Sequence, residues 1–265
     1  MSAPDTRALL PGALAELGLA LSPGACDRLL AHLGLISKWN KVYNLTAVRN
    51  PAEMVTHHLL DSLAAVRPLA GFLASRPIPS PSNGHAGRAI DGAPEAPPRG
   101  LHVLDVGSGA GLPGVTLAIA LPETLEILAQ QRGAGAAGGL LAEGSANVGV
   151  TCVDAVAKKA GFIRQVAAEL GLSALQAVHG RIEALAIGPA DVITCRAFAS
   201  LSDTVRLTSR HLAPGGVWMA LKGMVPTEEM AALPADIEVF HVEPLRVPHL
   251  DAQRCLVWMR RRQGA

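Results

Sequence analysis

The chain has 265 residues, of which 49% are apolar and 17% charged, and its formal net charge is +1. This composition is typical of a globular protein and excludes a disordered chain, while the small net charge excludes a molecule that is basic overall. No apolar run reaches the roughly 18 residues of a membrane span, and the first residues lack a secretion-signal pattern, so we expect a cytoplasmic protein without a membrane anchor.

Residues 1–70 predict an N-terminal helical extension. Ser22 followed by Pro23 is a good helix start, because proline at the first helical position loses no hydrogen bond. Apolar residues then recur at helical spacing at Leu29, Leu30, Leu33 and Ile36. A further helix is expected to begin at Asn50-Pro51.

Residues 71–100 hold six prolines and five glycines and show no periodicity. We interpret this segment as an exposed, largely unstructured linker. It would tether the helical extension to a second body that begins near residue 101.

From residue 101 onward, predicted strands alternate with helical patterns. The predicted strands are 101–106, 150–154, 175–178, 191–195 and 216–221, and the clearest helix is 158–171. Such alternation predicts an α/β fold with a mainly parallel sheet covered by helices on both faces. Two late apolar stretches, 237–247 and 254–262, have no long helix between them and are expected to form an antiparallel pair at the sheet edge.

A Gly/Ala-rich segment, about residues 123–149, fits this pattern poorly. It contains LEILA, which competes with VTCVD (150–154) for the position of the second strand. We favour VTCVD because it ends in an acid and leads into an amphipathic helix. The Gly/Ala-rich segment is then an insertion, which we interpret as a loose loop.

The run DVGSGAGLPG, residues 105–114, follows the first predicted strand directly. Its glycines would lie at the carboxyl edge of the sheet, where open α/β sheets bind ligands and where glycine lets a ligand approach the backbone. The spacing excludes a P-loop, and GAGLPG matches the dinucleotide pattern GxGxxG formally. Asp105, Gly107, Gly109 and Gly111 also match the acid-x-Gly-x-Gly-x-Gly loop that binds S-adenosylmethionine.

The acid of this motif, Asp105, distinguishes between these two candidate ligands. Asp105 would attract the cationic amino group of S-adenosylmethionine and would repel a pyrophosphate, so we favour the methyl donor; a turn or capping role is the alternative for Asp105. Asp154 ends the second predicted strand, where it could accept hydrogen bonds from the ribose of the donor. Its alternative role is a helix cap ahead of Lys158.

Six motifs occur together in order: WNKVYNLTAVRNPAEMVTHHLLDSL, DVGSGAGLPGV, KKAGFIRQVAAELGL, VHGRIEAL, CRAFASL and ALKG. Together they resemble the bacterial 16S ribosomal RNA guanine-N7 methyltransferases, also known as the glucose-inhibited division protein B family. The resemblance covers most of residues 20–260 and fails only in the Pro-rich linker and the Gly/Ala-rich insertion. It implies a Rossmann-like, S-adenosylmethionine-dependent methyltransferase domain over 101–265, with a seven-stranded sheet. The acceptor it implies is a guanine in the 16S rRNA of the small ribosomal subunit.

The resemblance also implies roles for individual residues. Gly107 and Leu112 are expected to line the donor, and Ile182 and Glu183 to border its adenine. Arg196 is expected at the site entrance near donor or RNA, and with Lys222 it is a candidate catalytic residue. The residues expected to face RNA are Arg181, Lys222 and Arg254, each with an ordinary surface charge as the alternative. Phe198 is a candidate flat partner for a base, or a core residue.

The chemistry agrees with this assignment. Guanine N7 has a lone pair and no proton, so it can attack the sulfonium methyl group in line without a general base, and no catalytic dyad is found in the sequence. His57, His58 and Asp61 form HHxxD, which is no known metalloprotease pattern, so we expect a packing role and no metal. The protein is expected to act as a monomer.

Two alternatives stay open on the sequence alone. GAGLPG by itself would suit an NAD-dependent oxidoreductase. The insertion beside the glycine loop would suit a non-catalytic rRNA-binding module with a degenerate donor pocket.

Overall fold

The computed structural model describes residues 6–75, 100–132 and 148–262. The first range holds the helices α1 (Thr6–Glu16), α2 (Pro23–Tyr43), α3 (Pro51–Met54), the π-helix η1 (Val55–Leu60), α4 (Asp61–Leu63) and α5 (Val66–Ala74). The second and third hold β1 (Leu101–Val106), α6 (Gly114–Arg132), β2 (Val148–Asp154), α7 (Ala157–Glu169), β3 (Leu175–His179), the 3₁₀ turn η2 (Ile182–Ala184), β4 (Ala190–Arg196), α8 (Leu201–Thr208), η3 (Ser209–His211), β5 (Leu212–Lys222), α9 (Thr227–Ala231), β6 (Ile237–Leu245) and β7 (Arg254–Arg261). In these ranges, no helix combines the length and apolarity needed to cross a bilayer.

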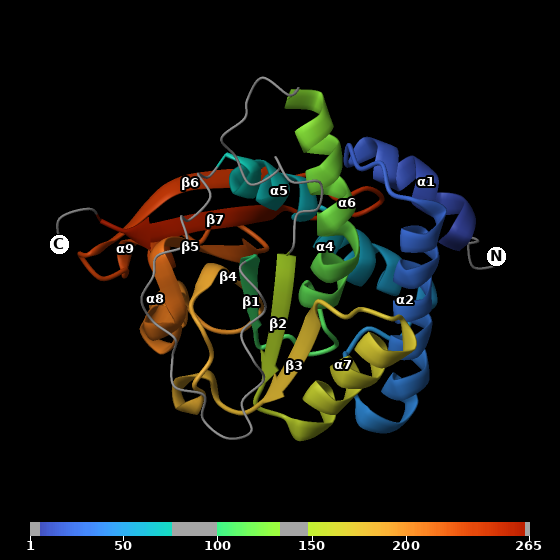
Figure 1. Cartoon of the computed structure of the whole chain (residues 1–265), viewed down its shortest axis with the longest axis horizontal. Helices are drawn as coiled ribbons and strands as arrows, with labels where there is room; N and C mark the ends of the chain where they lie inside the picture. The colour runs from blue at the N-terminus through green and yellow to red at the C-terminus, as the bar shows by residue number, and fades with distance from the viewer. Residues whose placement is uncertain (1–5, 76–99, 133–147, 263–265) are drawn as a thin grey trace.

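The strands form one seven-stranded sheet in the order β3-β2-β1-β4-β5-β7-β6 (Figure 1). The first five are parallel, whereas β7 runs antiparallel to both β5 and β6. The predicted α/β class and the antiparallel pair at the sheet edge are therefore confirmed. Chain order reverses between β1 and β4, which creates the crevice at their carboxyl ends where such sheets bind ligands.

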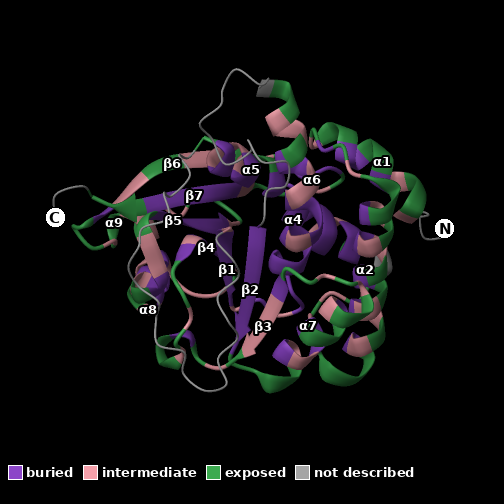
Figure 2. Cartoon of the chain, in the orientation of Figure 1, coloured by how far each residue is buried: buried purple, intermediate pink, exposed green. Residues whose placement is uncertain are grey.

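Both faces of the sheet are covered, because side chains on a strand alternate between faces. On β1, Val103 belongs to a large apolar cluster shared with α2, α5, α6 and α7, whereas Leu104 and Val106 belong to a second cluster shared with α8. In Figure 2 the strands β1 and β2 are buried along their length, and exposed residues lie on the outer faces of the helices. A fully buried sheet of this kind explains why its strands are near-continuous apolar runs.

The N-terminal helices share that large cluster instead of forming a core of their own. Trp39 of α2 packs edge-on against Phe162 of α7, with ring centroids 5.3 Å apart. Leu29 and Ile36, which the helical spacing marked as buried, are fully buried. The helical extension and the sheet-containing part are therefore continuous through one apolar core.

Two predicted boundaries need correction. Helix α5 extends to Ala74, so the linker's first residues are helical, and residues 76–99 lie outside the described ranges. LEILA lies inside α6, so VTCVD is the second strand as favoured, but the start of the insertion is not a loose loop. Glu123 of α6 joins this part of the helix to α2. Its carboxylate accepts hydrogen bonds of 2.7 Å from both the backbone N–H and the hydroxyl of Ser22, just before α2 begins. Residues 133–147 lie outside the described ranges.

Candidate functional site

The carboxyl edge of the sheet, at the reversal between β1 and β4, carries two cavities. The larger has a volume of about 440 Å³ and lies between the glycine loop, the ends of β4 and β5, and the N-terminal helices. The smaller, about 250 Å³, lies between the ends of β1 and β2 and the turn η2. Gly107 lines both cavities, so the two adjoin at the first residue after β1.

The glycine loop has a backbone that only glycine adopts easily. Gly107, Gly109 and Gly111 have φ angles of 72°, 58° and 79°. The N–H groups of Gly107 and Ser108 both donate to the carbonyl of Val153, which attaches the loop to β2. A Cβ atom at Gly107 would lie 2.5 Å from the ring of Phe198, so a larger residue would displace that ring.

Asp154 connects the glycine loop to α7. One carboxylate oxygen accepts a 2.9 Å hydrogen bond from the N–H of Gly109, and the other accepts 2.8 Å from the N–H of Val156, just before α7 begins. Asp154 therefore holds the turn that leads into α7, but it is not the helix cap given as its alternative role, because the capping residue is Val156 and no side chain caps that helix. The carboxylate is buried and is not among the residues lining either cavity, so contact with a donor ribose stays a proposal.

Asp105 lies beneath the loop and not in a cavity. It is fully buried, and its carboxylate accepts a 2.9 Å hydrogen bond from the N–H of Gly114 at the start of α6. Burial raises the pKa of this carboxyl group to about 6. The alternative role is thus present, because Asp105 points to the face of β1 that α6 covers and holds the start of that helix, whereas contact with the donor's amino group stays a proposal.

Asp61 organises the wall of the large cavity. Its two carboxylate oxygens accept hydrogen bonds from Arg196 of β4, at 2.9 Å, and from Arg254 of β7, at 2.6 Å. Arg196 also donates to the carbonyl of His57 at 2.8 Å, and the His58 ring lies 2.7 Å from the Thr46 hydroxyl. The HHxxD stretch therefore joins the N-terminal helices to the sheet, as a packing role requires.

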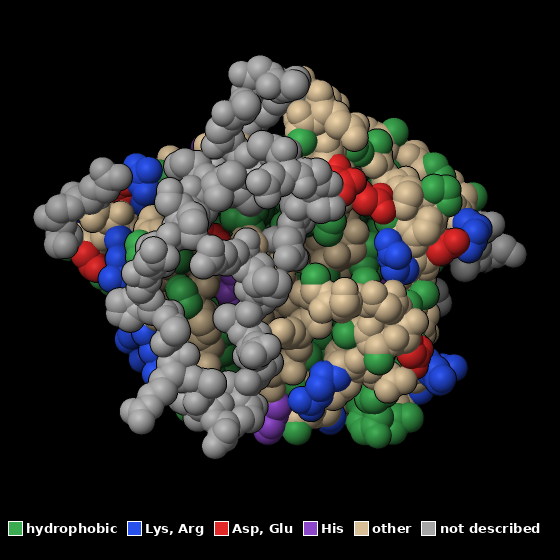
Figure 3. All heavy atoms as spheres, viewed as in Figure 1, with side chains coloured by type: hydrophobic (Ala, Val, Ile, Leu, Met, Phe, Trp, Pro, Cys, Tyr) green, Lys and Arg blue, Asp and Glu red, His purple; other side chains and the backbone are tan. Residues whose placement is uncertain are grey.

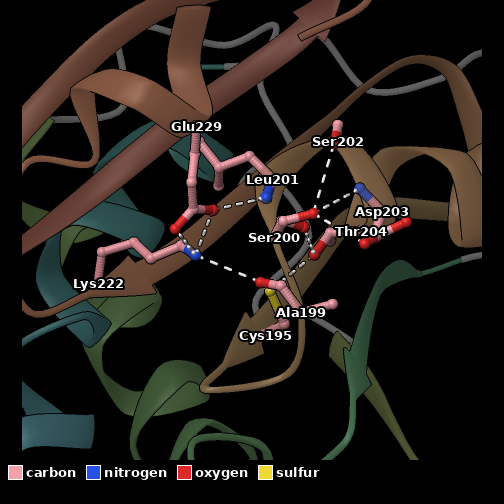
Figure 4. Close-up of polar contacts among 9 residues, drawn as sticks. All are labelled: Cys195, Ala199, Ser200, Leu201, Ser202, Asp203, Thr204, Lys222 and Glu229. Atoms are coloured by element: carbon pink, nitrogen blue, oxygen red, sulfur yellow. Dashed lines mark hydrogen bonds and ion pairs between the residues drawn. The ribbon is translucent and has the colours of Figure 1, made fainter. Parts of the chain in front are cut away.

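Lys222, at the end of β5, also lines the large cavity. Its ammonium group lies 2.8 and 3.0 Å from the two carboxylate oxygens of Glu229 and 3.3 Å from the Ala199 carbonyl. Glu229 also accepts a 2.7 Å hydrogen bond from the N–H of Leu201, at the start of α8, as Figure 4 shows. Sequence reasoning missed Glu229, because nothing in the local pattern distinguishes it from Glu228.

The other predicted residues divide between the cavities. Gly109 and Leu112 line the large cavity, whereas Arg181, Ile182, Glu183 and Phe198 line the small one. Gly111 lines neither; a Cβ there would lie 2.4 Å from Val115, so it is needed where the loop passes close to α6. Arg181 is exposed and donates to Glu183 at 2.8 Å.

Within the described part of the chain, no group of three or more His, Cys, Asp or Glu residues is placed to hold a metal ion. Two carboxylates of this wall have cationic partners: Asp61 has two and Glu229 one. The pKa of His58 is lowered, chiefly by burial and then by Arg196. Asp61 and Glu229 therefore hold the cations of this wall in fixed positions.

Comparison with known proteins agrees with this geometry. A family model described as rRNA small subunit methyltransferase G matches residues 25–73, 89–132 and 131–257. Ribosomal RNA small subunit methyltransferase G of Methylibium petroleiphilum is 50% identical over 261 residues, covering 97% of each chain. The protein of that name from an Acidovorax species is 51% identical, over 96% of this chain and 94% of its own. Among solved structures, TrmN from Thermus thermophilus matches 62% of this chain and 44% of its own at 20% identity and a TM-score of 0.41.

Proposed function

Because the chain belongs to the rRNA small subunit methyltransferase G family, we propose that it transfers a methyl group from S-adenosylmethionine to N7 of a guanine in 16S rRNA. The observation that carries the proposal is the glycine loop at the sheet's reversal point, with adjoining cavities on its two sides. The chain would act as a monomer in the cytoplasm, and its partner would be the small ribosomal subunit.

The two cavities suit the two halves of the reaction. The small cavity, with Ile182 beside β2, would take the adenine of the donor, and Asp154 would approach the ribose as the donor passes the end of β2. The donor would pass Gly107, which lines both cavities, so that its methionine part and the sulfonium lie in the large cavity. The guanine would enter that cavity, where Leu112, Arg196 and Lys222 surround it.

The reaction itself needs positioning and not proton transfer. The N7 lone pair attacks the methyl carbon, the bond from carbon to sulfur breaks with its electrons left on sulfur, and the guanine becomes cationic. No proton is lost from N7, which agrees with a cavity wall whose carboxylates are already paired. Arg196 and Lys222 would orient the base and its phosphate, while Asp61 and Glu229 hold these two cations in place.

The family assignment supports this function over a dinucleotide-dependent oxidoreductase. The intact glycine loop and the open cavities support an active enzyme over a non-catalytic RNA-binding module.

The test is transfer of label from methyl-labelled S-adenosylmethionine to purified small ribosomal subunits, followed by digestion of the rRNA to nucleosides. We expect label in 7-methylguanosine. A Gly107→Ala variant should bind the donor at least about tenfold more weakly, because it combines a left-handed backbone with displacement of Phe198, which together cost about 1–3 kcal/mol. Donor binding without any label in guanine would refute the proposed acceptor.

A further inference from the structure

A second group of cations lies on α2 and α7, and among the described residues no acid pairs with it. The end of α2 contributes Lys38 and Lys41, and the start of α7 contributes Lys158 and Lys159. Residues 38–50 and 155–164 contain no Asp or Glu. Within the ranges that the structure describes, none of these four lysines forms an ion pair. The first acid along α7 is Glu169, at the other end of that helix, where Gln165 donates to it.

The two segments lie against each other. Phe162 of α7 packs against Trp39, and its ring stacks on that of His32, with centroids 6.2 Å apart. Lys158 lies one helical turn before Phe162 and so shares its side of α7. In Figure 3, Lys and Arg side chains lie over the lower ends of α2 and α7.

Both helices that carry these lysines are connected to the glycine loop. His32 lies 2.9 Å from the Ala110 carbonyl, and Asp154 connects Gly109 to the residue before α7. Just after α2, Leu45 and Thr46 line the large cavity. The end of α2, which carries Lys41, therefore leads directly into the wall of that cavity.

An aromatic side chain lies among them. Tyr43, the last residue of α2, is 39% exposed and packs one side of its ring near Trp39, with centroids 5.2 Å apart. Trp39 continues the contact inward to Phe162, so Tyr43 is supported from beneath. Unpaired cations beside an exposed, supported ring are the chemistry by which proteins bind single-stranded RNA.

We propose that Lys38, Lys41, Lys158 and Lys159, together with Tyr43, form a basic platform that binds the rRNA strand next to the target guanine. The lysines contact backbone phosphates, and Tyr43 stacks on an unpaired base. This inference rests on the proposed function, since it concerns the same substrate. RNA is favoured over an acidic protein because the platform borders the cavity that a nucleotide must enter.

The test compares Lys41→Gln/Lys158→Gln with Arg261→Gln/Arg262→Gln, which removes the same charge near the opposite end of the sheet. Binding of a short fluorescein-labelled single-stranded RNA is followed by anisotropy over a range of salt concentrations. Each lost phosphate contact should reduce the slope of log affinity against log salt by about 0.7, which corresponds to about 25-fold weaker binding at about 0.1 M salt for two contacts. The KM for small subunits should rise, while donor affinity and melting temperature stay as in wild type.

A Tyr43→Leu variant separates stacking from charge. It should weaken binding about fivefold or more without changing the salt slope. The proposal is overturned if the lysine variant keeps the wild-type affinity and slope, or if the arginine control loses as much. Normal RNA binding with a raised KM for subunits would instead point to an acidic ribosomal protein and would also overturn it. If wild type binds RNA through these lysines but transfers no methyl group, the proposed function fails and the platform stands.

Discussion

Two groups of cations are held in opposite ways: one lines the large cavity, and the other, the basic platform, lies on α2 and α7. Arg196, Lys222 and Arg254 have side chains only 21%, 18% and 23% exposed, and each pairs with a carboxylate from another element. The lysines of the basic platform pair with none among the described residues, and Lys41 and Lys158 are exposed.

The difference follows from what each group has to do. Around the reacting atoms a cation must stay in one place, and a buried ion pair fixes its geometry even when it adds little net stability. Capture of an RNA strand needs charges whose field reaches into solvent, and an acid beside each lysine would cancel that field. Paired cations therefore indicate positioning, and unpaired ones indicate recognition.

The largest effect is expected from removing the acid that holds the cavity arginines. Asp61→Ala leaves the largely buried cations Arg196 and Arg254 without a carboxylate, and should lower the free energy of unfolding by about 3 kcal/mol. The free energy of unfolding of the variant and of wild type is measured by denaturant titration. The control is Asp27→Ala, which breaks an exposed pair with Arg7 and should cost at most about 1 kcal/mol. Equal effects would mean that the cavity pairs are no more fixed than surface ones.

The second test concerns His32, which connects the helix of the platform to the glycine loop. Burial lowers the pKa of His32 to about 4. The unfolded chain takes up a proton below about pH 6.5 while the folded protein does not, so stability is lost as pH falls from there toward 4. Across that window wild type should lose about 3 kcal/mol more than His32→Gln, whose amide can still donate to Ala110.

Urea unfolding of both proteins at several pH values measures this difference. His179→Gln, at the exposed last residue of β3, serves as the control and should keep the wild-type profile. If His32→Gln shows the same pH dependence as wild type, the imidazole is not the group that titrates.

Much of the fold was predictable because its signals are local. The strands are short apolar runs bounded by turn residues, and all of the predicted ones exist. The glycine loop identified the functional edge, because no other segment combines a buried strand with three glycines at alternate positions. LEILA was ambiguous, since a five-residue apolar run does not distinguish strand from helix. In the structure LEILA continues α6, whose Leu121 and Leu125 are buried, and Glu123 of the same helix accepts hydrogen bonds from Ser22, 101 residues away in sequence.

The pairing of the cations could not be read from the sequence. Arg196 and Arg254 were identified as site residues, but their partner Asp61 lies 135 and 193 residues away. One signal was available: Asp61 interrupts an apolar helical run between Leu60 and Leu63, and a buried acid usually has a cationic partner. Asp105 shows the limit of motif reasoning. The acid-and-glycine spacing was present, yet the direction of a side chain from a buried strand depends on which helix covers it.

The smallest effect is expected from a substitution that removes the acid partner of a paired cation. Glu229→Gln keeps a carbonyl to accept from the Leu201 N–H but removes the charge that holds Lys222. If pairing with an acid is what distinguishes the two groups of cations, Lys222 without its partner should gain a phosphate contact. RNA binding should then tighten about three- to fivefold at about 0.1 M salt, and the salt slope should steepen by about 0.7. Glu228→Gln, one residue away and exposed, is the matched control for net charge. An unchanged slope with a lower rate of methyl transfer would mean that Lys222 only positions the base, and that RNA capture belongs to the platform alone.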